Sequence, residues 1–131
     1  MGLAAGARQP TTWSRDLIAG PDAPAEARWF LHGAVAPLKL DEELQTATLL
    51  ISEVVSNAVR HGSGAPGSWI GLTITDTGPF LRVSVCDQGP GFDPAEIDRR
   101  GHRGGLFLLD VLAYDWGIRR SSAGTEVWFE I

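Results

Sequence analysis

The run of residues 41–62 constrains the fold most, because its apolar side chains recur at three- and four-residue spacing. This is the period of an amphipathic helix with one buried face. The side chains that share this face are Leu44, Ala47, Thr48, Ile51, Val54, Val55 and Ala58. The run opens with Asp41, Glu42 and Glu43, and carboxylates in a first turn stabilise the positive end of a helix. The pattern therefore predicts one long helix packed against a core.

The same run carries a second, polar stripe. Glu53, Asn57 and His61 follow one another at intervals of four residues, which places them along one side of a helix. A carboxylate and an amide one turn apart, beside a packed apolar face, suit a divalent cation and its bound phosphates. The competing interpretation is a solvated helix surface, which such a stripe more often is. The helix alone does not distinguish a cation and phosphate site from a solvated surface, so the motifs in the rest of the chain are needed.

Composition limits the class of protein. The 131 residues, 44% of them apolar and 21% charged, predict one soluble globular domain. A net charge of −5 argues against direct nucleic-acid binding. The single cysteine, Cys86, excludes an intrachain disulfide and a multi-cysteine zinc site. With no apolar stretch near the roughly 20 residues of a membrane span and no signal-peptide pattern, we expect a cytoplasmic protein without a membrane segment.

The order of predicted elements indicates the architecture. Residues 1–10 are expected to form a flexible tail, and residues 11–131 a single domain. Strands are predicted at about 11–19, 69–75, 80–86, 116–120 and 125–131, and helices at about 24–36, 41–62 and 106–113. Asp22 is a candidate cap for the first helix, which Pro37 ends. This order predicts an α/β fold: a two-layer sandwich with a mixed, mostly antiparallel sheet and helices on one face.

A candidate ligand-binding turn follows the second strand of the predicted hairpin, in the pattern Asp87-x-Gly89-x-Gly91. The Asp87 carboxylate can accept a hydrogen bond from an exocyclic amine, and the two glycines let the backbone approach a planar ring closely. The competing interpretation is an ordinary Asp-x-Gly turn.

Two further segments add polar groups. Gly104 and Gly105 come directly before the short helix, where backbone N–H groups and the helix dipole attract an anion. Arg103 adds a positive charge suited to phosphate oxygens. Thr125 opens the last strand with a hydroxyl that can share a water or a hydrogen bond with the amine that Asp87 would bind. Taken singly, these segments also fit a flexible connection and an ordinary strand threonine.

The joint pattern is more specific than any of its parts. Its segments, in order, are Glu53-x-x-x-Asn57, Asp87-x-Gly89-x-Gly91, a glycine-rich loop and Gly124-Thr125-x-Val127. This order resembles the ATP-binding fold shared by DNA gyrase, the heat-shock chaperone of that superfamily, sensor histidine kinases and the mismatch-repair protein MutL. Within it, residues 53–61 and the ending Val127-Trp128-Phe129-Glu130 resemble the anti-sigma factor serine kinases, over about residues 11–131.

The resemblance implies ATP and Mg²⁺ as cofactors and gives the helix its roles. Asn57 matches the asparagine that binds Mg²⁺, through which the metal bridges the phosphates. Glu53 matches the catalytic carboxylate that orients or deprotonates the nucleophile, here a serine hydroxyl of a partner. Arg60 falls where related kinases place a basic residue toward the phosphates.

The resemblance also implies roles outside the helix. Asp87 matches the aspartate that reads adenine, with Gly89 and Gly91 in the turn beneath the ring and Thr125 in support. Gly104 and Gly105 match part of the lid over the phosphates. This family usually has Gly-x-Gly before a Leu or Phe at that point, and Arg103 replaces the first glycine. Arginine adopts a positive φ less readily than glycine, which changes the lid.

Three functions follow as expectations. The first is an ATP-dependent protein serine kinase that holds a sigma factor and phosphorylates an anti-sigma antagonist, with a homodimer in keeping with the resemblance. The second is a partner-switching module that binds ATP without catalysis, favoured by Arg103 in the lid. The third is the catalytic part of a split histidine kinase whose phospho-acceptor lies on another chain.

Overall fold

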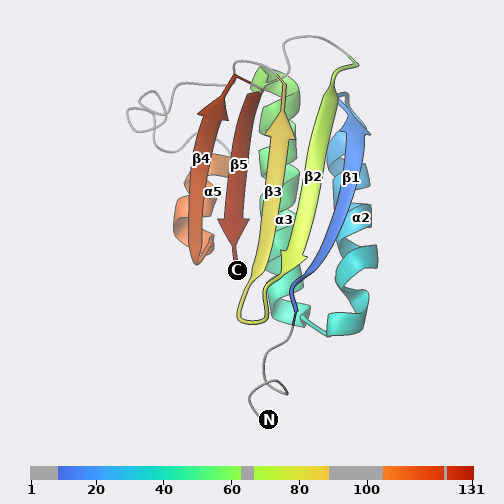
Figure 1. Cartoon of the computed structure of the whole chain (residues 1–131), viewed down its shortest axis with the longest axis vertical. Helices are drawn as coiled ribbons and strands as arrows, with labels where there is room; N and C mark the ends of the chain where they lie inside the picture. Colours follow the sequence, from blue (N-terminus) through green and yellow to red (C-terminus); the bar gives the residue numbers. More distant parts are fainter. Residues whose placement is uncertain (1–8, 63–66, 89–104, 123) are drawn as a thin grey trace.

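A single sheet with helices packed on one face forms the protein, as Figure 1 shows. The computed structural model describes residues 9–62, 67–88, 105–122 and 124–131. The elements are β1 (Thr11–Ile18), α2 (Ala23–Val35), the 3₁₀ turn η1 (Ala36–Leu38), α3 (Asp41–Asn57), the π-helical turn η2 (Ala58–Gly62), β2 (Trp69–Asp76), β3 (Leu81–Asp87), α5 (Gly105–Leu112), β4 (Asp115–Ser121) and β5 (Gly124–Glu130).

The strands lie in the order β1-β2-β3-β5-β4, and each pairing among them is antiparallel. β2 and β3 form the expected hairpin, with Asp76 opposite Leu81. β1 lies at one edge of the sheet and β4 at the other. The two-layer α/β class is therefore confirmed, but the sheet is antiparallel at every pairing and not mixed.

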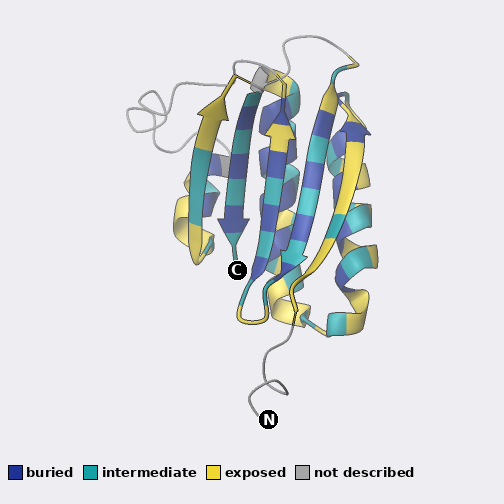
Figure 2. Ribbon diagram, viewed as in Figure 1, coloured by how far each residue is buried: buried dark blue, intermediate teal, exposed yellow. Residues whose placement is uncertain are grey.

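The core fills the space between the sheet and the helices. Alternate residues of β2, β3 and β5 are buried, so that one face of each strand is apolar, and Figure 2 shows this alternation along the strands. The helices contribute a matching apolar stripe. The largest fully buried side chains are Phe129, Leu17, Leu31, Leu50, Ile51, Ile70, Leu72, Ile74, Leu109, Val35, Val54 and Val55.

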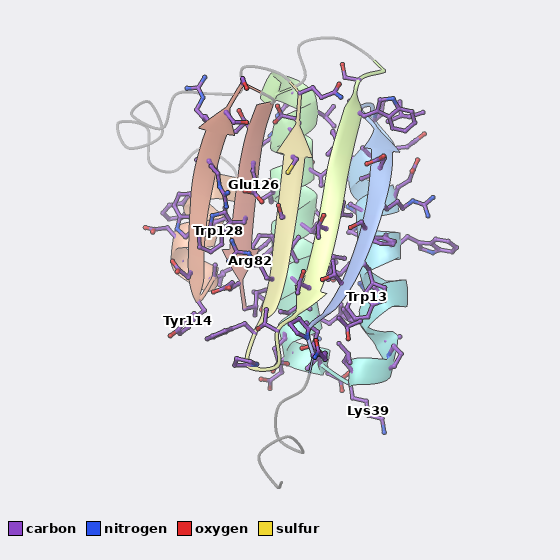
Figure 3. All side chains as sticks on the ribbon, viewed as in Figure 1. Trp13, Lys39, Arg82, Tyr114, Glu126 and Trp128 are labelled. Atoms are coloured by element: carbon purple, nitrogen blue, oxygen red, sulfur yellow. The ribbon has the colours of Figure 1, made fainter. Side chains whose placement is uncertain are left out.

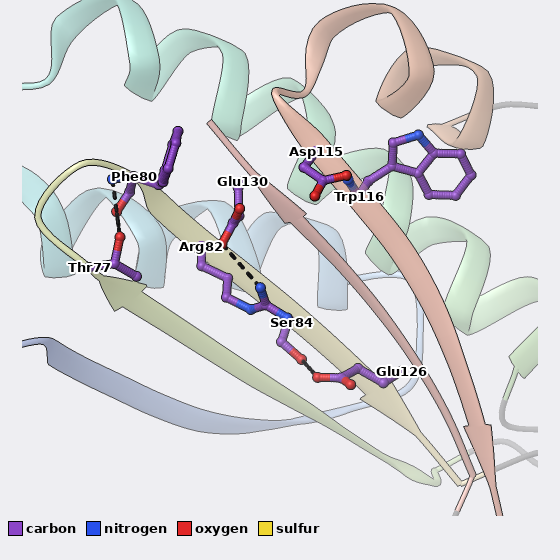
Figure 4. Close-up of polar contacts among 8 residues, drawn as sticks. All are labelled: Thr77, Phe80, Arg82, Ser84, Asp115, Trp116, Glu126 and Glu130. Atoms are coloured by element: carbon purple, nitrogen blue, oxygen red, sulfur yellow. Dashed lines mark hydrogen bonds and ion pairs between the residues drawn. The ribbon is translucent and has the colours of Figure 1, made fainter.

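The other face of the sheet is polar, and Figures 3 and 4 show its side chains. Arg82 lies over the Trp128 ring, 4.0 Å from its centroid, and pairs with Glu130 at 3.1 Å. The Ser84 hydroxyl donates to Glu126. Such partly exposed pairs add little stability, so the fold depends on the helix-covered face.

The helix boundaries follow local chemistry. Asp22 occupies the N-cap position of α2 but makes no side-chain capping hydrogen bond, so the expected cap is wrong. Pro24, in the first turn, has no N–H to leave unsatisfied there. Pro37 lies in η1 directly after α2, as predicted, and Lys39 turns the chain with a φ of 55°. Among the described residues, no helix is long and apolar enough to cross a membrane.

The long helix ends differently from the prediction. The α-helical part stops at Asn57, and residues 58–62 form the π-helical turn η2. The N–H of Ala58 is shared between the carbonyls of Val54 and Val55 at the boundary between the two elements. Single π-helical turns occur frequently at functional sites. The α-helical geometry that sets Glu53 and Asn57 one turn apart therefore stops at Asn57.

Candidate functional site

Asp87 and Thr125 form the polar centre of the site. Asp87 is the last residue of β3, and Thr125 lies directly opposite it on β5. Both are buried, with 7% and 2% of their surfaces exposed. The β3–β5 register therefore places Asp87 and Thr125 side by side.

The Thr125 hydroxyl has an unused hydrogen-bonding capacity. Its Oγ1 is buried and has no hydrogen-bond partner among the described residues. An unsatisfied buried polar group costs about 1–3 kcal/mol. A ligand amine or a bound water that contacts this oxygen would remove that cost. The residues present thus fit a polar, ring-bearing ligand such as adenine.

Gly124 brings the two strands together at this point. Its φ is +139°, a region that side-chain-bearing residues rarely adopt, and a Cβ here would collide with the carbonyl oxygen of Asp87. From the sequence, Gly124 is only the first residue of the motif Gly124-Thr125-x-Val127. Its place directly before Thr125, at the start of a strand, could have indicated this structural role.

A small cavity connects the strands to helix α3. Its lining residues are Val54, Asn57, Ala58, Val85, Asp87, Leu106 and Val127. The cavity has a volume of about 10 Å³, which is room for about one water molecule. A purine ring therefore requires the walls to separate. Among the apolar lining residues, Val85 and Val127 lie two positions from Asp87 and Thr125, and Val54 and Ala58 lie on the same helical run as Asn57. Strand alternation and helix periodicity could have indicated these four, but not Leu106 of α5.

Asn57 supplies the polar lining of the cavity from α3, and Arg60 of η2 hydrogen-bonds to it. Asn57 is only 7% exposed, and Arg60 Nη2 donates to its Oδ1 at 2.8 Å. An amide oxygen has two lone pairs, so one stays available for a metal while Arg60 holds the other. Glu53, half-buried, lies one helical turn before Asn57 but does not line the cavity. This end of α3 thus presents a carboxylate, an amide oxygen and a guanidinium in succession.

The described residues contain no group of three or more His, Cys, Asp or Glu that could hold a metal ion. Mg²⁺ does not need one, because it usually keeps several waters and binds through one or two protein ligands plus substrate phosphates. Asn57 as the one protein ligand fits that chemistry. The described side chains thus suit a metal that arrives with its nucleotide.

The structure brings four of the predicted site residues together. Asn57 and Asp87 line one cavity, Arg60 donates to Asn57, and Thr125 pairs with Asp87. Glu53 lies one turn before Asn57 on α3 but does not line the cavity. Gly105 is the first residue of α5, whose next residue, Leu106, lines the cavity. Gly89, Gly91, Arg103 and Gly104 lie outside the described residues.

Cys86 precedes Asp87 but has no part in this site. Alternation along β3 turns it to the polar face of the sheet, where it is exposed. Partial burial raises the pKa of its thiol, while a hydrogen bond with Ser84 acts against this. A raised pKa keeps the thiol protonated and unreactive.

Comparison with known proteins decides the family. The family described as the histidine kinase-like ATPase domain matches residues 19–131. This chain belongs to that family. The ATP-binding superfamily that the sequence motifs indicated is therefore confirmed, and a histidine kinase-like ATPase domain implies ATP binding.

Two curated relatives of this ATPase domain are sensor proteins. The sensor protein LytS of Streptococcus mutans is 32% identical in an alignment that covers 60% of this chain and 17% of LytS. The sensor histidine kinase YpdA of Escherichia coli is 34% identical over 70% of this chain and 19% of YpdA. The chain thus spans less than a fifth of the length of either relative.

A solved structure shares the fold of this ATPase domain. The crystal structure of the RsbU and RsbW domains of Rv1364c from Mycobacterium tuberculosis aligns with a TM-score of 0.70. The alignment covers 92% of this chain and 32% of that one, at 22% identity. At this identity the likeness establishes the fold alone.

Proposed function

We propose that this ATPase domain is a cytoplasmic protein serine kinase of the anti-sigma type, which holds a sigma factor and phosphorylates a serine of its antagonist. The observation that carries the proposal is the convergence of Asn57 and Asp87 on one cavity, beside the orphaned hydroxyl of Thr125. These two polar side chains come from separate elements and are both buried, which supports a ligand that is contacted from the sheet and from the helix at once.

Each of these residues has one task in the proposal. The Asp87 carboxylate accepts a hydrogen bond from the adenine amine, and the Thr125 hydroxyl supports the same contact. Asn57 holds Mg²⁺ through Oδ1, and Arg60 keeps that amide oriented by the hydrogen bond at 2.8 Å. ATP with Mg²⁺ supplies the phosphoryl group and neutralises its developing charge.

Glu53 is the catalytic residue in this proposal. It lies one turn from Asn57 on α3, so a carboxylate stands beside the metal-binding amide. There it orients the partner's serine hydroxyl or accepts its proton. Phosphoryl transfer depends mostly on such positioning, so Glu53 affects transfer more than nucleotide affinity.

The regulatory role in this proposal is supported by a resemblance in sequence. The ending Val127-Trp128-Phe129-Glu130, which forms most of β5, resembles the anti-sigma factor serine kinases. The neighbour in fold contains RsbU and RsbW domains. Sigma factor and antagonist are the partners that this likeness suggests.

The test is phosphoryl transfer from γ-labelled ATP by the full chain to proteins of its own cell lysate. We expect a small protein to gain an acid-stable phosphoserine when Mg²⁺ is present. Glu53→Gln should lower the rate of transfer at least a hundredfold while ATP affinity changes less than threefold, because general-base effects are worth roughly 10²–10⁴ in rate. Glu26→Gln, an exposed carboxylate on α2, is the matched control and should transfer normally.

A second candidate function is favoured by the curated relatives. LytS and YpdA are both sensor proteins and are more than 30% identical to this chain. By that likeness the domain would transfer phosphate to a histidine on another protein. The same assay separates the candidates, because phosphohistidine is lost in acid and phosphoserine is retained. If the chain binds ATP tightly but transfers phosphate to neither serine nor histidine, the candidate that remains is a nucleotide-dependent switch without catalysis.

A further inference from the structure

A second, larger cavity lies at the opposite end of the molecule from Asp87. Its volume is about 370 Å³, which falls at the lower end of the range of about 300–1,000 Å³ for small-molecule sites. Its walls come from the connection between α2 and α3, the first turn of α3, the β2–β3 turn and the connection between α5 and β4. Figure 1 shows these segments together at one end, away from the end of β3.

Two aromatic rings form one wall of this cavity. Phe80 and Tyr114 are stacked, with ring centroids 4.5 Å apart and an interplanar angle of 29°. Tyr114 is 71% exposed, and its backbone N–H donates to the carbonyl of Glu130 at 2.7 Å, which fixes the main chain there. Figure 3 labels Tyr114 at this end. Tyr114, exposed on a fixed backbone and stacked on the half-buried Phe80, offers a ring face to a ligand.

The charged lining residues are both acidic. They are Glu43, exposed in the first turn of α3, and Asp76, which is 8% exposed at the end of β2. The N-terminus of α3 contributes about half a positive charge, and this is outweighed by the three carboxylates of its first turn. The cavity therefore presents negative charge beside an aromatic wall.

We propose that this cavity binds a small organic ammonium ion with an apolar body. A cation gains both from the face of an aromatic ring and from nearby carboxylates, and Leu40 and Leu81 give the ligand's carbon atoms an apolar surface. An anion is repelled by the same groups. The site is separate from the proposed ATP site and does not rest on the proposed function.

The test is a titration of the full, ¹⁵N-labelled chain with 2-phenylethylammonium chloride, followed by NMR, with 2-phenylethanol as the uncharged probe of the same shape. We expect saturable shifts at Leu40, Phe80 and Tyr114 in the millimolar range, and an affinity at least fivefold lower for the alcohol. Glu43→Gln and Tyr114→Leu should each weaken binding of the ammonium probe at least threefold. Their matched controls are Glu42→Gln and Trp29→Leu, exposed positions that do not line the cavity.

Three results would overturn the proposal. The first is equal affinity for 2-phenylethanol, which would show that the cavity binds apolar groups without selecting a positive charge. The second is full binding by Glu43→Gln and Tyr114→Leu, and the third is the absence of saturable shifts at this end up to 20 mM probe. Because all four substitutions are at exposed side chains, the variants are expected to fold, and ¹⁵N spectra check this directly.

Discussion

Two buried aspartates end neighbouring strands of the same sheet, and they have opposite surroundings. Asp76 ends β2 and Asp87 ends β3, at opposite ends of the antiparallel hairpin. Their exposed fractions, 8% and 7%, are nearly equal. Each begins an Asp-x-Gly-Pro pattern, residues 76–79 and 87–90. Neither burial nor local sequence distinguishes them.

The difference lies in the neighbouring polar groups. At the first aspartate, Asp76 Oδ1 accepts from the N–H of Gly78 at 3.0 Å. Thr77 Oγ1 donates to the carbonyl of Phe80 and accepts from its N–H, as Figure 4 shows in part. At the second aspartate, the hydroxyl of Thr125 has no partner among the described residues and a cavity lies beside it. We infer that Asp76 closes a turn, whereas Asp87 serves a ligand.

The largest difference between the Asp76 end and the Asp87 end of the sheet is expected in the free energy of unfolding when a glycine at each end is replaced by alanine. Gly124→Ala should lower the free energy of unfolding by about 3 kcal/mol or more, because a strained φ is added to a collision with Asp87. Gly78→Ala, at a φ of +100° with nothing within 4 Å of its Cβ, should cost about 1 kcal/mol. Urea denaturation measures both. Equal costs would mean that the strands at Asp87 are not held as closely as described.

The next largest effect concerns ATP itself. Asp87→Ala should weaken ATP binding about 10–100-fold, since a hydrogen bond to a charged group is worth roughly 1.5–3 kcal/mol. Asp76→Ala should change ATP affinity less than twofold and act on stability instead. Calorimetric titration of both variants gives the comparison. Similar losses in the two would show that the effect is a general loss of structure.

A smaller effect is expected for magnesium. Asn57→Ala should reduce the gain in ATP affinity that Mg²⁺ provides by about tenfold, because its oxygen is the proposed protein ligand. ATP binding with EDTA should be little changed. Gln45→Ala, an exposed amide on the same helix, serves as control. A magnesium effect that survives intact in Asn57→Ala would remove Asn57 from the metal site.

The smallest expected effect is on the free energy of unfolding, and it has opposite signs for Thr125→Val and Thr77→Val. Thr125→Val should raise the free energy of unfolding by about 1 kcal/mol, because it replaces an unsatisfied buried hydroxyl with a methyl group. It should also weaken ATP binding. Thr77→Val should lower stability by a similar amount, because it breaks the contacts with Phe80. Thermal unfolding with and without Mg-ATP measures the stability and the ATP binding of both variants. A loss of stability in Thr125→Val would contradict the conclusion that its buried hydroxyl is unsatisfied.

The fold was largely predictable because burial periodicity is local. The spacing of Ile51, Val54 and Val55 predicts α3, and all three are buried. The π-helical turn η2 was not predicted, because the apolar spacing up to Ala58 fits an α-helix that simply continues. The absence of a side-chain cap at Asp22 likewise depends on geometry that the residue type does not determine.

The site was predictable only in part. Asp87 and Thr125 were placed together by motif order, and the β3–β5 register bears out their proximity. Their distinction from Asp76 and Thr77 required three-dimensional contacts, because both patterns read as Asp-x-Gly-Pro. Gly124 was not assigned a role, since its constraint comes from a backbone carbonyl that is distant in sequence.

Binding of ATP at the Asp87 end can be measured by titrating the ¹⁵N-labelled chain with Mg-ATP and following its amide signals. We expect saturable shifts at Asp87, Thr125, Asn57 and Arg60, and none of comparable size at Asp76 or Tyr114. Saturation with the main shifts at the Asp76 end, or no binding by the folded chain, would contradict this expectation.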